Sequence, residues 1–316
     1  MMKTFDIICI GAALVDMVAQ VDRFPKNDDE VFVSKLKIFS GGAAANTAYA
    51  CAKLGLKTAF IGKLGRDDLF GLKILDGFEE GKVNTELLKY SETISTGSAY
   101  VVLNKGGERR IYAHSGAANY LSKEDIVISE ISSAKILFLS SLKNTEPFIK
   151  AAEIGKKKNI PVILNPGMLI IEQGFLNIRR LLKKTDILII SQREFQTLFE
   201  LHEEELSMDI AQDKVVKLYD LDIRVLVITL GKNGALLITP DDVDIIPSFK
   251  VNQVIDTTGA GDAFSAGFLY GFCKNLSFDF EALKNNVKIG NFVASRTIEK
   301  LGARNGIPKP EDIELE

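Results

Sequence analysis

"DTTGAGDAFSAGFLYGFC" (residues 256–273) is the segment that constrains the fold of this chain most tightly. From Phe264 onward, apolar and small residues recur at helical spacing, namely Phe264, Gly267, Phe268, Gly271 and Phe272. The glycine-rich turn at 259–262 therefore predicts the start of a helix. Free N–H groups and the positive end of the helix dipole make such a start a natural anion site.

Asp262 follows this turn directly, and two interpretations of it stay open. A carboxylate beside an anion site has a purpose in phosphoryl transfer, where it accepts the proton of the attacking hydroxyl. The alternative is an ordinary aspartate cap after a glycine turn. The segment lacks the P-loop pattern, and Phe264 stands where GxGxxG needs its third glycine. A dehydrogenase of the NAD type is therefore disfavoured.

Two further glycine clusters are candidates for ligand binding. "SGGAAANTAYACAKLG" (40–55) opens another helix, and Asn46 in its first turn offers a donor and an acceptor that suit a polyhydroxylated ligand. "ITLGKNGAL" (228–236) follows an apolar run, at the place where open α/β sheets bind ligands. Close packing of small residues explains the first cluster equally well, and a hairpin turn explains the second.

The rest of the chain alternates between short apolar runs and helical segments. The runs are rich in Ile, Leu and Val, as in strands buried on both faces of a parallel sheet. They lie at 5–11, 57–65, 134–142, 161–167, 186–191 and 224–231. Helical spacing is found at 43–54, 145–158 and 208–221. The predicted fold class is α/β, with helices on both sides of a mostly parallel sheet.

Two regions depart from this pattern and predict a small second sheet. Residues 13–39 partly alternate between apolar and polar positions, and 97–114 suggest a hairpin around Gly106-Gly107. Such a sheet could cover a site as a lid, or it could extend the edge of the main sheet. The main domain is then expected to comprise 1–12, 40–96 and 115–316.

Composition excludes several classes of protein. The chain has 316 residues and a net charge of −3, which argues against nucleic acid as a main partner. Three widely spaced cysteines (Cys9, Cys51 and Cys273) and two histidines argue against a disulfide framework or a zinc site. The N-terminal apolar run is interpreted as a strand, and no run reaches the roughly 18 residues of a membrane span. We expect a cytoplasmic protein with no membrane partner.

Together the clusters resemble the ribokinase-like, PfkB-type carbohydrate kinases. "GGAAANTAYACAKLGLKTAFIGKLGRDDLFG" (41–71) is similar to the family's N-terminal signature, and "DTTGAGDAFSAGF" (256–268) to its C-terminal one. The resemblance covers essentially the whole chain. It implies a Rossmann-like α/β domain, a β-sheet lid, and ATP-dependent phosphorylation of a hydroxymethyl group on a sugar or nucleoside.

The resemblance also implies a role for individual residues. The catalytic base would be Asp262, and the anion hole would comprise Gly259, Ala260 and Gly261. Substrate hydroxyls would bind at Asp16, Gly41, Gly42 and Asn46. The nucleotide would lie against Thr229, Gly231, Gly234 and Asn291, with Glu194 tied to magnesium and phosphate. A monovalent cation, with potassium as the family's candidate, would bind near Asp256, Thr258, Thr297, Lys300 and Gly302.

Three departures from the family pattern bear on substrate and cofactors. Ser191 stands where the family's Asn-x-x-Glu motif has asparagine, although Glu194 is kept. Ribokinases have a sugar-binding glutamate after the strand at 135–142, whereas this chain has no acid there until Glu146. Gly306 occupies the position of a frequent serine ligand of the cation.

The leading hypothesis is an ATP-dependent kinase for a ribose- or fructose-type sugar. A purine nucleoside kinase of the same family and a sugar or nucleotide sensor without turnover are the alternatives. A homodimer that pairs through the lid is also expected, because "EVFVSKLKIF" (30–39) supplies an apolar face.

Overall fold

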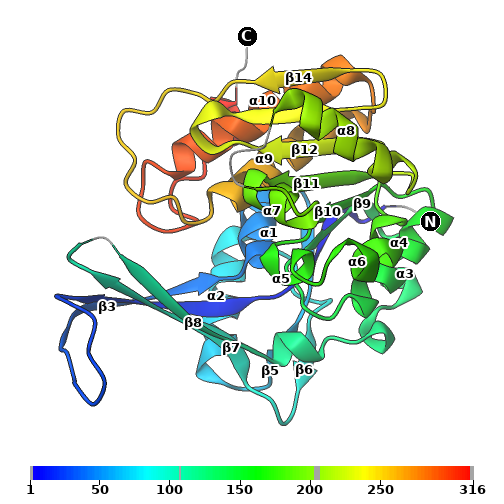
Figure 1. Ribbon diagram of the computed structural model, residues 1–316. Coiled ribbons are helices and arrows are strands. Elements are labelled where there is room, and N and C mark those ends of the chain that lie inside the picture. Colours follow the sequence, from blue (N-terminus) through cyan, green and yellow to red (C-terminus); the bar gives the residue numbers. More distant parts are fainter. Residues whose placement is uncertain (1–2, 107, 203–206, 314–316) are drawn as a thin grey trace.

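The computed structural model describes residues 3–106, 108–202 and 207–313. An eight-stranded sheet runs through its centre in the order β14-β13-β12-β11-β10-β9-β1-β4 (Figure 1). Its strands are β1 (Phe5–Gly11), β4 (Thr58–Ile61), β9 (Ala134–Ser140), β10 (Val162–Asn165), β11 (Ile187–Ser191), β12 (Val225–Thr229), β13 (Ala235–Ile238) and β14 (Val243–Ile246). The six strands from β12 to β4 are parallel, and β13 and β14 are antiparallel additions at one edge.

Helices cover both faces of this sheet and create two apolar cores. Along β1, Ile8 and Ile10 belong to one core while Ile7 and Cys9 belong to the other, and all four are fully buried. The first core packs under α3 (Ile128–Ser132), α4 (Glu146–Lys157), α5 (Met168–Ile171), α6 (Phe175–Leu182), α7 (Gln192–Leu198) and α8 (Met208–Tyr219). The second packs under α1 (Ala43–Lys53), α2 (Leu69–Gly81), α9 (Ala260–Asn275) and α10 (Phe280–Thr297). The predicted α/β class is confirmed.

One predicted strand proves to be two. The run at 57–65 divides into β4 and β5 (Lys63–Gly65), and β5 pairs with β6 (Lys89–Ser91) outside the main sheet. Gly62 stands at the break, where a Cβ atom would come within 2.8 Å of the Gly11 carbonyl oxygen. The apolar pattern continues through this glycine, so it does not reveal that the chain leaves the sheet there.

The second sheet is separate from the main one, so the edge-extension alternative is wrong. It consists of β2 (Leu14–Val21), β3 (Val33–Gly41), β7 (Thr96–Asn104) and β8 (Arg109–Gly116), in the order β3-β2-β7-β8. In Figure 1 these strands lie below the main sheet and extend away from it. The predicted hairpin is present as β7 and β8, although Gly107 of its turn lies outside the described residues.

Four short 3₁₀ helices complete the described elements, namely η1 (Ala117–Tyr120), η2 (Lys123–Asp125), η3 (Gly231–Asn233) and η4 (Pro310–Asp312). Of the helices in the described ranges, none combines the length and the apolar character needed to cross a bilayer. The three cysteines are free thiols.

Candidate active site

The first turns of α1 and α9 meet beside the carboxyl ends of the parallel strands. Asn46 Nδ2 on α1 donates a hydrogen bond to Asp262 Oδ2 on α9 over 3.0 Å, across 216 positions of sequence. The hydroxyl of Thr47 lies 3.4 Å from the Asp262 carbonyl oxygen. Ligands bind at this edge of open α/β sheets, so the two helices bring Asp262 to the expected place.

The environment of Asp262 suits a general base. Burial raises the pKa of its carboxyl from 3.8 to about 7, with smaller contributions from the nearby carboxylates of Asp16 and Glu194. The hydrogen bond from Asn46 and the positive charge of Arg304 act in the opposite direction, because they stabilise the ionised form. A base with a pKa near the working pH is ionised in a useful fraction of the molecules and is still basic enough to accept a proton from the substrate hydroxyl.

Asp16 reaches the same site from the small sheet. It lies on β2 opposite Phe39 of β3, and burial raises the pKa of its carboxyl to about 6. A Cβ atom on Gly41 would come within 2.1 Å of Asp16 Oδ2, so only glycine leaves room for this carboxylate. Gly42 is the N-cap of α1. The predicted substrate-binding residues Asp16, Gly41, Gly42 and Asn46 are thus brought together.

The start of α9 offers N–H groups to an anion. Gly259 is the N-cap and has a left-handed backbone with φ of 78°. The Ala260 N–H is partly used, since it donates to the Thr257 carbonyl over 3.2 Å. In the described part of the chain, the N–H groups of Gly261 and Asp262 have no backbone acceptor, as is usual in a first helical turn. A Cβ atom on Gly261 would meet nothing within 4 Å. The space beside this turn is therefore open.

A cavity of about 540 Å³ continues from this helix start toward β12 and α10. It is lined by the predicted nucleotide residues Thr229, Gly231, Gly234 and Asn291 and reaches Ala260 and Gly261. The Asn291 amide donates to the carbonyl oxygens of Ile246 (3.0 Å) and Pro247 (3.1 Å), which fixes this wall. The loop at 248–254 supplies further lining that we had not predicted, including Phe249, Val251 and Val254. This loop has no periodic pattern that could have signalled its role.

Comparison with known proteins identifies the family. The model of the pfkB family of carbohydrate kinases matches residues 4–310. The chain belongs to this family. It is therefore a phosphotransferase that acts on a hydroxyl group of a carbohydrate.

Named relatives of this kinase are also carbohydrate kinases. It is 29% identical over 314 residues to the ribokinase of Staphylococcus aureus, covering 98% of this chain and 99% of the relative. It is 30% identical over 322 residues to a probable chloroplastic fructokinase of Arabidopsis thaliana, covering 97% and 81%. The solved structure of an Arabidopsis thaliana ribokinase complexed with ribose and ATP superposes with a TM-score of 0.85 at 26% identity, covering 97% and 96%. The ribokinase-like fold is confirmed.

In this pfkB kinase, Ser191 and Glu194 form a capping box at the start of α7. Ser191 is the N-cap of α7, and its N–H and hydroxyl donate to Glu194 Oε2 over 2.7 Å and 2.9 Å. The Glu194 N–H donates back to Ser191 Oγ over 3.2 Å. Ser191 also pairs with Thr229 in the sheet. Glu194 is therefore held at the end of β11 through its Oε2 atom.

The predicted cation ligands of the kinase gather around Asp256. Its carboxylate accepts the N–H groups of Thr258 (2.9 Å) and Gly302 (2.8 Å), and these bonds lower its pKa against the effect of burial. The Thr297 carbonyl accepts the Lys300 N–H over 3.2 Å. A Cβ atom on Gly306 would lie 2.5 Å from the Thr297 carbonyl oxygen, so a serine does not fit there. The donor set therefore matches the family's cation site only in part.

Arg304 is a site residue that sequence reasoning missed. Its Nε atom donates to Asn46 Oδ1 over 2.9 Å, and burial lowers its pKa to about 10. A single arginine in a loop carries no pattern that announces such a contact.

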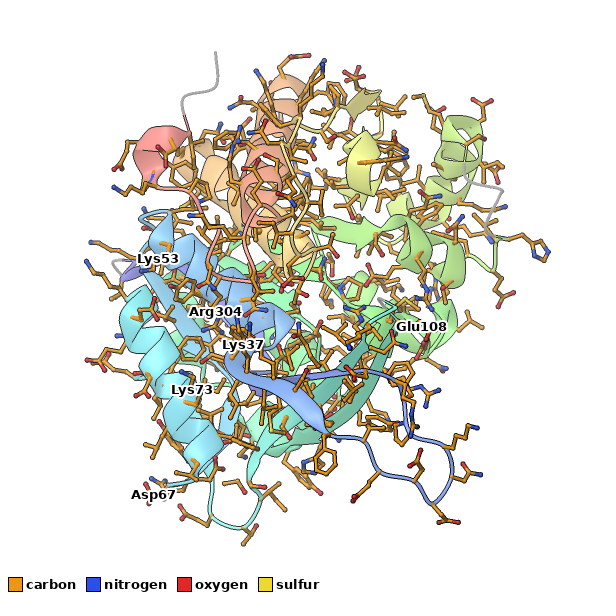
Figure 2. The ribbon with its side chains drawn as sticks, turned by 90° about the vertical axis from the view of Figure 1, so that its left-hand side faces the viewer. Lys37, Lys53, Asp67, Lys73, Glu108 and Arg304 are labelled. Atoms are coloured by element: carbon orange, nitrogen blue, oxygen red, sulfur yellow. The ribbon has the colours of Figure 1, made fainter. Side chains whose placement is uncertain are left out.

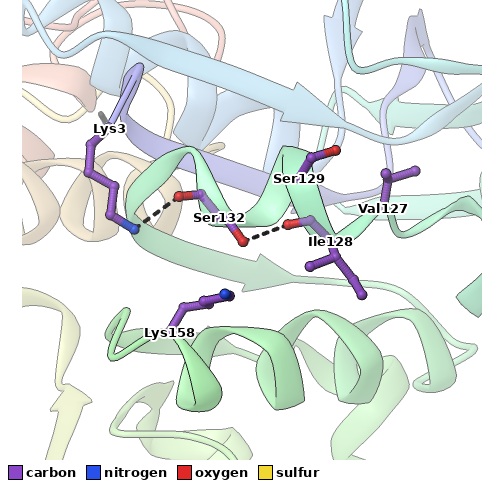
Figure 3. A pocket seen from close by; sticks show the side chains of 6 residues that line it. All are labelled: Lys3, Val127, Ile128, Ser129, Ser132 and Lys158. Carbon is purple, nitrogen blue, oxygen red and sulfur yellow. Dashed lines mark hydrogen bonds between the residues drawn. The ribbon is translucent and has the colours of Figure 1, made fainter. Parts of the chain in front are cut away.

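The kinase has another hollow, of about 680 Å³, whose lining side chains are drawn in Figure 3. It is lined by Val127, Ile128, Ser129, Ser132, Lys3 and Lys158. Lys3 Nζ donates to the Ser132 carbonyl over 3.1 Å. These residues precede β1 and β9 or follow α4, so they belong to the amino ends of the strands. The hollow is therefore remote from the predicted site.

Proposed function

We propose that this chain is an ATP-dependent kinase for the primary hydroxyl of a ribose- or fructose-type sugar, with Asp262 as general base. The observation that carries the proposal is the position of Asp262. It lies in the first turn of α9, bonded to Asn46, beside open N–H groups and a cavity that begins at the same turn. Carboxylate, anion site and cavity thus serve one reacting centre.

The proposed reaction follows from this arrangement. The sugar binds between Asp16 and Asn46, where one carboxylate can accept hydrogen bonds from two neighbouring hydroxyls. The primary hydroxyl gives its proton to Asp262 while its oxygen bonds to the γ-phosphorus of ATP, and the bond to the bridging oxygen of ADP breaks. The N–H groups of Gly261 and Asp262 stabilise the charge on the transferred phosphoryl group.

Magnesium fits the donor set at the end of β11. Mg²⁺ keeps several waters and takes one or two carboxylates besides substrate phosphates. In the described part of the chain no cluster of three acidic, cysteine or histidine side chains is present, so the ion would be held by Glu194 together with water and phosphate oxygens rather than by an all-protein cage. When bound, the ion would neutralise charge on the phosphates of ATP.

The hydrogen bonds from Ser191 are expected to matter for nucleotide use. Ser191→Ala removes the hydroxyl that caps α7 and holds Glu194. Loss of such a cap costs about 1 kcal/mol in stability. Because Glu194 is then less well placed, we expect KM for magnesium-ATP to rise several-fold with a smaller change in kcat. Steady-state kinetics with varied ATP measures this, and Ser207→Ala, which removes the cap of α8, is the control. Equal KM values in both variants would count against a role for Glu194.

Substrate choice among sugars is proposed from the relatives. Curated relatives include a ribokinase, a deoxyribokinase of Salmonella typhi and a probable fructokinase, all 29–30% identical to this chain. The segment after β9 has no acidic residue until Glu146, whereas the resemblance implies a sugar-binding glutamate there in ribokinases. A purine nucleoside offers the same primary hydroxyl and is the alternative substrate.

A substrate panel tests the proposed function. ADP release is measured with ATP and D-ribose, 2-deoxy-D-ribose, D-fructose or adenosine, and the product is examined by phosphorus NMR. We expect a phosphate monoester from one of the three sugars. Turnover with adenosine alone would favour the nucleoside kinase. Binding without any product would favour the sensor and overturn the proposal.

We further propose that the small sheet acts as a lid and joins two copies of the chain. Exposed apolar side chains gather on it, and Phe32 just before β3 is 87% exposed. Leu36 and Ile38 lie on one face of β3 and are also exposed. In sedimentation, we expect twice the 34.7 kDa mass of one chain. Leu36→Lys with Ile38→Lys should give the single-chain mass, while Leu176→Lys on α6 should not. A single-chain mass for the unaltered protein would refute pairing.

Potassium and a cytoplasmic location stay predictions. Asp256 and the neighbouring carbonyl groups support a monovalent cation, whereas Gly306 withholds one ligand. Free thiols suit a reducing compartment.

A further inference from the structure

Arg304 joins two segments that lie far apart in the sequence, the loop after α10 and helix α1. It lies in the loop after α10, yet its Nε atom bonds to Asn46 Oδ1 across 258 positions of sequence. Its guanidinium lies over the rings of Tyr49 (5.0 Å) and Phe78 (6.0 Å). Figure 2 labels Arg304 next to the blue ribbon of the N-terminal part of the chain. The contact therefore joins three elements, namely this loop, α1 and α2.

The guanidinium end of Arg304 is enclosed, although the residue as a whole is only partly buried. Its Nη1 and Nη2 atoms are buried and have no hydrogen-bond partner in the described part of the chain. A Cβ atom on Gly77 of α2 would come within 2.8 Å of Nη1, so a glycine makes room for the guanidinium. A charged group buried at such cost requires a compensating role. A direct contact with substrate is not that role, because the two terminal nitrogens are shielded from solvent.

The hydrogen bonds of Asn46 define the first part of the role. Arg304 Nε can only donate and the Asp262 carboxylate accepts. With Oδ1 facing Arg304, the Nδ2 group of Asn46 must face Asp262. A flipped amide would place two donors together at Arg304 and two acceptors together at Asp262. Arg304 thereby selects the amide orientation that supports Asp262.

The charge of Arg304 defines the second part. It acts on the carboxylates of Asp262 and Asp16 and favours the ionised form of both. The charged and polar groups that influence Asp262 are Asn46 from α1, Asp16 from β2, Glu194 from α7 and Arg304. Arg304 is the one cation among these four groups.

We propose that Arg304 is a positioning residue for phosphoryl transfer, which orients the Asn46 amide toward Asp262 and holds a positive charge near its carboxylate. The inference rests on the proposed role of Asp262 as the general base. Arg304 acts through these two residues and touches neither ATP nor the sugar.

The pH profile of kcat/KM tests the proposal, with the best substrate of the panel above. An opposite charge nearby typically lowers a carboxyl pKa by about 1–3 units. Arg304→Met should therefore move the acid limb of the profile up by about one unit and lower kcat/KM at pH 6 about tenfold. Arg304→Lys keeps the charge but loses the planar donor. We expect its acid limb to stay near the wild-type position while kcat falls several-fold.

A matched control removes an arginine stacked on a ring elsewhere. Arg224 lies 3.5 Å over the ring of Phe278 and precedes β12, at the amino edge of the sheet. Arg224→Met should leave the pH profile unchanged. If Arg304→Met does not fold, as judged by thermal melting, Arg304→Lys decides the question. Wild-type kcat in that variant would overturn the proposal.

A double-mutant cycle separates this inference from the proposed function. Asp262→Asn removes the group through which Arg304 acts, so Arg304→Met should cost little further activity in that background. Full turnover by Asp262→Asn alone would sink the role of the base. An inactive Asp262→Asn with an unshifted acid limb in Arg304→Met would overturn only the role of Arg304. Additive losses in the double variant would do the same.

Discussion

Asp262→Asn should lower kcat by about 100-fold or more, as expected for the loss of a general base. Asparagine keeps the size and the contact with Asn46 but cannot take the proton of the attacking hydroxyl. ATP affinity should be largely kept, because the N–H groups and the cavity are unchanged. Steady-state kinetics and calorimetric titration of ATP give the two values.

The pH dependence of stability tests the raised pKa of Asp262 independently of activity. The pKa of Asp262 is about 7 in the folded chain and near 3.8 in the unfolded one, so the folded state binds the proton more tightly. The stabilising contribution of Asp262 is then complete below pH 4 and is lost as pH rises through 7. Asp262→Asn does not titrate. Its melting temperature relative to the wild type should therefore rise between pH 4 and pH 8.

The helix-cap alternative makes the opposite prediction for stability. A cap residue stabilises its helix when ionised, so its removal would lower stability at pH 8. Asp209 is an exposed acid in the first turn of α8, like Asp262 in α9, and Asp209→Asn is the matched control. We expect unchanged kcat for that variant. Because Gly259 is the N-cap of α9, near-normal turnover of Asp262→Asn would leave Asp262 only the role of a first-turn acid that favours the helix dipole.

Gly261→Ala should lower activity strongly without loss of stability. A Cβ atom at this position would meet nothing within 4 Å, and its backbone φ is not positive. Because alanine is a better helix former than glycine, stability should stay equal or rise by up to about 1 kcal/mol. The methyl group would occupy the space where a phosphoryl oxygen approaches the N–H groups. We expect kcat to fall by about 100-fold, as with loss of an oxyanion-hole donor.

Gly259→Ala is the contrasting variant. Its φ of 78° and a Cβ distance of 2.4 Å to Ala303 Cβ predict a loss of stability. Thermal melting and kcat of the two variants should therefore change in different ways. If Gly261→Ala retains full activity, no phosphoryl oxygen approaches this turn.

Most of the fold followed from patterns that single segments carry. The apolar runs at 134–142 and 186–191 are typical of strands covered on both faces, and they form β9 and β11. The glycine turn at 259–262 predicted a helix start there, and α9 begins in this turn with Gly259 as its N-cap. These strands and this helix start depend on residues close together in the sequence, so local periodicity predicts them.

What the sequence did not predict depends on contacts between distant segments. Arg304 gains its importance from Asn46, and no spacing rule connects two such positions. The placement of the second sheet away from the main one depends on packing with α2, which alternation of residues does not encode. The lining at 248–254 is irregular and gave no signal.

The distance along the chain between Asn46 and Arg304 bears on how the enzyme is made. Translation proceeds from the N-terminus, and domains begin to fold before the chain is finished. A nascent chain that ends before Arg304 already contains the predicted nucleotide residues and Asp262, but not the arginine that orients Asn46. Full orientation of the Asn46 amide thus waits for Arg304, which is synthesised after Asp262 and the predicted nucleotide residues.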